Sequence, residues 1–155
     1  MKVDIGLNDK ARKTAAEALG KVLASTYLLY TKTQSFHWNV TGPLFPQLHA
    51  QFGEQYDALA EAIDEIAERI RSLGHAAPGS FAQFAKLSAV REQSGTPKAE
   101  KMIAELLADH ETLVRLARET KDIVEGAGDS ESGDLMVERM QEHGKTAWML
   151  RSQLA

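Results

Sequence analysis

Residues 74–97, GHAAPGSFAQFAKLSAVREQSGTP, form the longest irregular stretch of the chain. Proline and glycine punctuate it toward both ends, while Ser80–Lys86 in its middle predicts one short amphipathic helix. On either side of it the apolar residues recur with the spacing of an α-helix, and no run alternates as a strand does. We therefore expect an all-α chain with one long connection in its middle.

Four long helices are predicted, two before this connection and two after it. Asn8 is expected to cap the first, Gly74 to end the second in a left-handed conformation, and Thr96 to cap the third before Pro97. Two short turns and one long crossover describe a ferritin-like four-helix bundle, here with a short extra helix between the second and third long helices. The predicted helices span residues 8–39, 46–73, 97 to 126 or 128, and 130–153.

Composition limits the classes of function. The 155 residues fit a single domain over 1–155, and 43% hydrophobic residues can build a core. The absence of cysteine excludes disulfide scaffolds, thiolate catalysis, zinc fingers and cysteine-ligated clusters. No apolar run approaches the ~20 residues of a membrane span, and the N-terminus lacks the pattern of a signal peptide. We expect a cytoplasmic protein.

Charge is unevenly distributed along the chain. Residues 1–96 carry ten basic and ten acidic residues, so the net charge of -4 comes from the remainder. Within residues 119–142, eight acids accompany only Lys121 and Arg139. This region favours attraction of cations over contact with a phosphate backbone, although an ordinary solvated acidic face explains the charge equally well.

Candidate metal ligands lie on the first two helices. His37 is near the end of one helix and His49 near the start of the next, so a short turn brings them to the same level. Asp64 and Glu68 are four residues apart on the second helix and share one of its faces. Imidazole and carboxylate together suit Fe(II), with zinc or manganese as competitors. The alternatives are chance placement of the histidines and a solvated acidic face.

Within one chain these candidate ligands are too far apart to bind the same metal ion. His49 and Asp64 are 15 residues apart, which is about 22 Å along a helix. A two-fold axis across this helix would place Asp64 and Glu68 of a second copy opposite His37 and His49. A metal site built from these residues must therefore lie between subunits. The Glu-x-x-His pair of di-iron sites inside a bundle does not occur, which argues against bacterioferritin, maxi-ferritin and rubrerythrin.

Several motifs resemble the Dps family, the DNA-protecting mini-ferritins of starved cells. They cover nearly the whole chain and comprise Phe36–Pro43 (FHWNVTGP), Leu48-His49, Asp64–Arg69 (DEIAER) and Lys145–Leu150 (KTAWML). The resemblance implies a hollow dodecamer with ferroxidase centres at two-fold interfaces, where Fe(II) is oxidised preferentially by hydrogen peroxide and ferric oxide is stored inside. It assigns His37 and His49 to one subunit of each centre, and Asp64 and Glu68 to its neighbour. A role in stress response, protecting DNA from oxidative damage, follows from the same resemblance.

One position departs from the family pattern. Four residues after the second histidine the family usually has Asp or Glu, and this chain has Gly53. The second iron position should consequently be weaker, and Asp57, one turn further on, is a hypothetical substitute ligand. The alternative function is a nucleoid-associated, DNA-binding stress protein whose ferroxidase centre has degenerated.

The resemblance also gives roles to residues outside this ligand set. Trp38 would sit beside the iron centre and react with radical intermediates, or serve only in packing. An acidic group at the start of the last helix resembles the lining of three-fold iron-entry pores, although the helix dipole also favours acids there. His75, His110 and His143 are interpreted as surface or capping residues. The proposed pore acids are Asp129, Asp134 and Glu138.

DNA is expected to be a weak partner. The N-terminus offers four basic residues against Asp4 and Asp9, a short segment compared with the Lys-rich tails of DNA-binding relatives. Twelve copies would add avidity, but we predict little binding at physiological salt. The four basic residues are Lys2, Lys10, Arg12 and Lys13.

Overall fold

The computed structural model describes residues 3–155 as five helices, and no strand occurs among them. Lys2 of the predicted basic N-terminus lies outside the described residues. The prediction of an all-α, ferritin-like bundle with a short extra helix is confirmed. The helices are α1 (Asp9–Asn39), α2 (Phe45–Ser72), α3 (Phe81–Leu87), α4 (Ala99–Gly126) and α5 (Ser130–Arg151).

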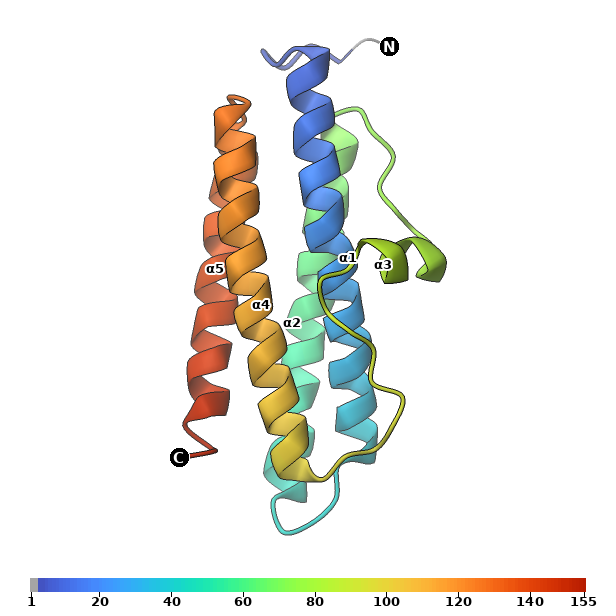
Figure 1. Ribbon diagram of the computed structural model, residues 1–155, viewed down its shortest axis with the longest axis vertical. Coiled ribbons are helices and arrows are strands. Elements are labelled where there is room, and N and C mark those ends of the chain that lie inside the picture. Colours follow the sequence, from blue (N-terminus) through green and yellow to red (C-terminus); the bar gives the residue numbers. More distant parts are fainter. Residues whose placement is uncertain (1–2) are drawn as a thin grey trace.

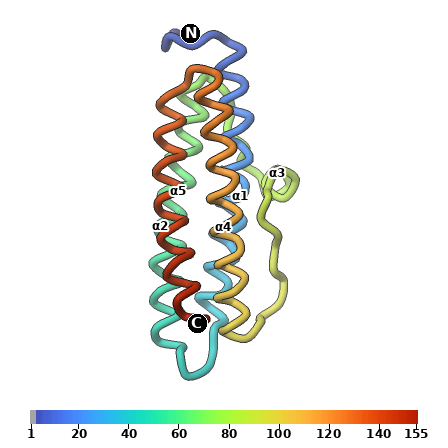
Figure 2. The backbone as a smooth tube through the Cα atoms, turned by 60° about the vertical axis from the view of Figure 1, so that its left-hand side comes forward, coloured from blue at the N-terminus to red at the C-terminus, as the bar shows by residue number. Residues whose placement is uncertain are grey.

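The crossover determines the direction of each helix. Helices α1 and α2 form an antiparallel hairpin, and the chain then returns along the outside of α1, carrying α3, before α4 begins (Figures 1 and 2). Because of this return, α2 and α4 run in the same direction, and α5 completes a second hairpin (Figure 1). The α1–α2 turn therefore lies at the opposite end of the bundle from the α4–α5 turn.

Local sequence explains most helix ends. The Asn8 side chain accepts a hydrogen bond from the Ala11 amide at 2.9 Å, as the cap prediction required. Gly74 has φ of 89°, and a Cβ there would lie 2.9 Å from the Arg12 guanidinium, so both conformation and packing require glycine. The predicted Thr96 cap is wrong: Lys98 is still extended and α4 begins at Ala99, a shift within the ordinary imprecision of helix ends.

Two clusters of buried side chains form the core. One lies toward the α1–α2 turn and includes Phe36, Leu48, Phe52 and Leu106. The other lies toward the opposite end and contains Leu19, Leu23, Ile66, Ile70 and Val124. The first cluster holds the ends of α1 and α2 together and so fixes the region where the two predicted histidine ligands lie.

Candidate metal centre

The α1–α2 hairpin brings His37 and His49 into direct contact. Their rings stack with centroids 3.8 Å apart and planes 21° from parallel. Both residues are half-buried, and Phe45 packs against the outer side of His49 with ring centroids 5.2 Å apart. The meeting of these two side chains is the geometry that the short turn predicted.

Each histidine fixes the other through the main chain. Nδ1 of His37 lies 2.6 Å from the carbonyl oxygen of His49, and Nδ1 of His49 lies 2.9 Å from the carbonyl oxygen of His37. A carbonyl only accepts, so both Nδ1 atoms must carry the proton and donate it. In the neutral imidazole Nε2 then carries the lone pair, and this tautomer binds a metal with a hydrogen-bonded partner behind it.

Gly53 leaves space that the His37 ring occupies. A Cβ built on Gly53 would lie 3.3 Å from both Cε1 and Nδ1 of His37, closer than an ordinary contact. Glycine at this position has no side chain to act as a ligand and allows the imidazole to sit against α2.

Gly53→Asp should strengthen binding at the second metal position. The added carboxylate would supply the ligand that the family usually has there, and we expect a gain of at least about tenfold in affinity, since even the loss of an outer-shell partner weakens a metal site by about that much. Calorimetric titration with Fe(II) under nitrogen measures this.

Gly53→Ala is the matched control, because it introduces the same crowding of His37 without a ligand. An equal gain in both variants would contradict the prediction. Asp57→Ala in the same titration tests the substitute ligand, whose loss should weaken the second binding event.

The predicted carboxylate ligands lie away from the histidines. Asp64 and Glu68 are exposed on α2, and within residues 3–155 neither forms an ion pair. No group of three or more histidine and carboxylate side chains in this part of the chain is placed to hold a metal ion. Asp57 is exposed as well. The four predicted ligands therefore do not form one site within this subunit, and a site between subunits stays a prediction.

The remaining predicted residues differ in their surroundings. Trp38 is 65% exposed and so is not part of the core of its own subunit. Asp129 is 2% exposed, caps α5 through the Ser132 amide and pairs with Arg69 at 2.6 Å. Asp134 and Glu138 are exposed, and Glu138 lies 3.2 Å from Arg139. Of the three acids assigned to a pore, these two present their carboxylates to solvent.

His110 and His143 contradict the sequence interpretation. They are 3% and 2% exposed, and their Nδ1 atoms are 2.9 Å apart between α4 and α5. Burial lowers the pKa of His110 to about 3 and lowers that of His143 well below its ordinary value, so both imidazoles are neutral at pH 7. Their spacing from buried residues of the same helices, such as Leu106 and Ala147, was the signal that could have shown this.

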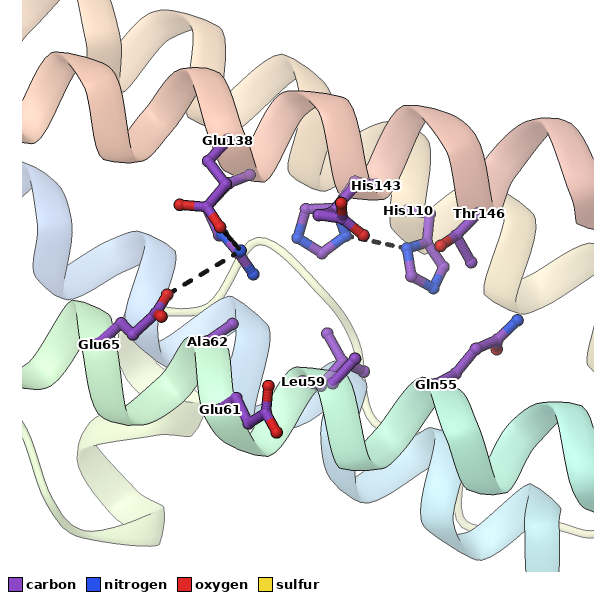
Figure 3. A pocket seen from close by; sticks show the side chains of 12 residues that line it. Gln55, Leu59, Glu61, Ala62, Glu65, His110, Glu138, His143 and Thr146 are labelled. Atoms are coloured by element: carbon purple, nitrogen blue, oxygen red, sulfur yellow. Dashed lines mark hydrogen bonds and ion pairs between the residues drawn. The ribbon is translucent and has the colours of Figure 1, made fainter.

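His110 and His143 line a cavity of about 200 Å³ between α2, α4 and α5 (Figure 3). Six buried side-chain nitrogen and oxygen atoms in residues 3–155 have no protein hydrogen-bond partner, and four belong to residues around this cavity. Glu65 and Glu138 lie toward one end of it (Figure 3). The four atoms are Gln55 Oε1, His110 Nε2, Arg139 Nε and His143 Nε2.

Comparison with known proteins identifies close similarities. Residues 16–155 match the ferritin-like domain family. A low temperature-induced protein of Nostoc sp. is 42% identical over 97% of this chain and 86% of its own length. DNA protection during starvation protein 2 of Bacillus anthracis is 34% identical over 90% of this chain and 96% of its own.

Solved structures agree with these sequence matches. The Dps protein of Vibrio cholerae O1, described as a member of a broad superfamily of ferritin-like diiron-carboxylate proteins, superposes with a TM-score of 0.94. The two sequences are 30% identical, and the match covers 100% of this chain and 98% of the other. No helix among residues 3–155 is long and apolar enough to cross a membrane.

Proposed function

Because this chain belongs to the Dps family of ferritin-like proteins, we propose that it oxidises Fe(II) with hydrogen peroxide and stores the ferric product in a hollow dodecamer. The observation that carries the proposal is the stacked pair of His37 and His49, whose Nδ1 atoms contact main-chain carbonyls and leave Nε2 as the ring nitrogen that could bind a metal. Two adjacent imidazoles held by main-chain hydrogen bonds suit Fe(II), the substrate. We place the protein in the cytoplasm, where Fe(II) and peroxide together threaten DNA.

The complete centre would form between two subunits. Asp64 lies about 22 Å and Glu68 about 28 Å along α2 from His49, so an antiparallel neighbour would supply them. Their negative charge would favour the ferric product over the ferrous substrate, and the imidazoles would hold the incoming ion. Two Fe(II) and one hydrogen peroxide, with two protons, give two Fe(III) and two water molecules.

Other surfaces have roles in this proposal. Asp134 and Glu138 are exposed on one side of α5 and would concentrate Fe(II) if three copies met there. Trp38, next to His37 and exposed, would face the iron centre across the interface. Light scattering measures the mass of the assembly and so tests the expected dodecamer directly.

Asp64→Ala/Glu68→Ala should reduce peroxide-driven Fe(II) oxidation to the rate seen without protein. Each centre loses both carboxylates and keeps only the two imidazoles. The absorbance of Fe(III) measures the rate. Glu61→Ala/Glu65→Ala removes the same charge from the same helix and should retain activity, and light scattering verifies that both variants assemble. Equal rates in the wild type and the first variant would leave only a scaffold role.

The structure gives a reason to expect weak DNA binding. Arg12, counted among the basic N-terminal residues, is 8% exposed and donates to the carbonyl of Leu73 at 2.9 Å while also pairing with Asp9. Its guanidinium is therefore committed within the subunit. Any duplex binding should be lost as salt rises, which a gel-shift series measures; tight, salt-resistant binding would support the DNA-binding alternative.

A further inference from the structure

All three tyrosines of the sequence lie in one row of ring contacts that begins at His37. Tyr56 meets His37 edge to face with centroids 5.2 Å apart, and Tyr30 meets Tyr56 at 5.9 Å. Tyr27 continues the row with an edge-to-face contact to Tyr30 at 5.8 Å. These are the usual geometries of packed aromatic rings, so each member touches the next.

The far end of the row reaches the surface. Tyr27 stacks on Phe84 of α3 at 4.4 Å and meets Phe81, which is 77% exposed, at 6.2 Å. Tyr27 and Phe81 line a surface cavity of about 300 Å³ beside the long connection. The row therefore runs from His37 along α1 toward α3, which packs on the outside of the bundle (Figure 1).

The order of these rings is structurally fixed. Tyr27 and Tyr30 are three residues apart on α1 and so face the same side of that helix. The Gln34 amide donates to the Tyr30 phenol oxygen at 3.1 Å, which holds that ring in place. All three tyrosines are half-buried, so their phenols are not sealed from water.

The number of electrons that hydrogen peroxide needs indicates a role for the row of tyrosines. Reduction of hydrogen peroxide to water takes two electrons, and one Fe(II) supplies only one. Gly53 leaves the second iron position without the carboxylate that the family usually has there, so under the proposed function we expect a centre at low iron to hold a single Fe(II). In a chain without cysteine, phenol and indole groups are the side chains that most readily supply the other electron.

We propose that Tyr56 supplies the second electron when one Fe(II) is bound, and that Tyr30 and Tyr27 carry the resulting radical to the surface. This rests on the proposed function. Fe²⁺, the Tyr56 phenol, hydrogen peroxide and one proton give Fe³⁺, a Tyr56 phenoxyl radical and two water molecules. The O–O bond and the phenolic O–H bond break, and that hydrogen ends in water.

The radical then moves by exchange of an electron and a proton. The Tyr56 radical takes both from the Tyr30 phenol, and the Tyr30 radical takes both from Tyr27. At the surface, a one-electron reductant such as a further Fe(II) ion or ascorbate, with a proton from water, restores Tyr27. Hydroxyl radical is thereby not released from a half-filled centre.

Freeze-quench electron paramagnetic resonance tests this on the assembled protein. Protein holding one Fe(II) per subunit is mixed with hydrogen peroxide, and Fe(III) is measured by absorbance in parallel. We expect a tyrosyl radical in the wild type, its loss in Tyr56→Phe, and its confinement to Tyr56 in Tyr30→Phe. Trp148→Phe, an exposed aromatic outside the row, is the control and should keep the signal.

Two further measurements make the result decisive. A spin trap should detect hydroxyl radical from Tyr56→Phe and not from the wild type. Peptide mapping of the peroxide-treated wild type, which needs no variant to fold, should find oxidation at the three tyrosines. Fe(III) formation with an indole radical that survives Tyr56→Phe and disappears in Trp38→Phe would overturn the proposal and leave the ferroxidase function intact. Fe(III) formation by the wild type no faster than without protein would overturn both.

Discussion

Acidification should destabilise this protein through His110 and His143. The pKa of His110 is lowered to about 3 by burial, and that of His143 is lowered well below its ordinary value by burial, by His110 and by Arg139. The unfolded chain takes up protons near pH 6.5, so between that pH and about 3 it binds protons that the folded chain does not. The contribution of these two neutral histidines to stability is therefore fully present above pH 6.5 and is lost as the pH falls below it.

The expected size is large for one pair of residues. At pH 4.5, two pH units below the unfolded pKa, His110 alone lowers the free energy of unfolding by about 3 kcal/mol, and His143 lowers it further. Urea unfolding at a series of pH values measures the effect.

His110→Gln/His143→Gln supplies the comparison, because the variant keeps polar side chains of similar size and removes the titration. Its stability should vary much less than that of the wild type between pH 6.5 and 4.5. His75→Ala, which changes a histidine outside the cavity, should retain the wild-type pH profile. A variant and a wild type with the same pH dependence would show that the buried pair does not cause the acid effect.

Lys32→Met should cost about 3–5 kcal/mol of stability at pH 7, because it leaves a buried carboxylate without its cation. Lys32 Nζ lies 2.6 Å from Asp109 Oδ2, and the two side chains are 6% and 15% exposed. Burial raises the pKa of Asp109, an effect that Lys32 only partly offsets through its hydrogen bond and charge. Chemical denaturation of the wild type and the variant measures the cost.

A double substitution separates the effect of charge from the effect of packing. Lys32→Met/Asp109→Leu removes both charges and should be far less damaging than Lys32→Met, since a buried ion pair is often replaceable by apolar groups. The cost of Lys32→Met should also shrink in acid, where Asp109 becomes neutral. A double variant as unstable as the single one would mean that the loss comes from packing and not from the unpaired carboxylate.

The fold was predictable because its signals are local. The period of apolar residues marks each long helix, and residues 74–97 are long enough to carry the chain back along the bundle before α4 begins. Helix caps are also local, which explains the success at Asn8 and Gly74. The error at Thr96 shows the limit, since several residues in one loop have the composition of a cap.

The candidate site was predictable only as a list of ligands. His37, His49, Asp64 and Glu68 are recognisable from residue type and spacing, and helix length alone indicates that one chain cannot bring all four together. Their assignment as iron ligands stays a prediction. The hydrogen bonds that fix both histidine tautomers involve main-chain carbonyls across a turn, and nothing in the residue pattern indicates them.

The sequence by itself determined the helices, the crossover and which imidazole and carboxylate side chains are candidate ligands, because these depend on neighbours along the chain. Tertiary structure decided which side chains from different helices meet. The rotation of α4 against α5 buries His110 with His143, and the packing of α2 on α1 places Tyr56 between His37 and Tyr30. Such meetings depend on how long helices rotate and cross, which a pattern along one helix does not specify.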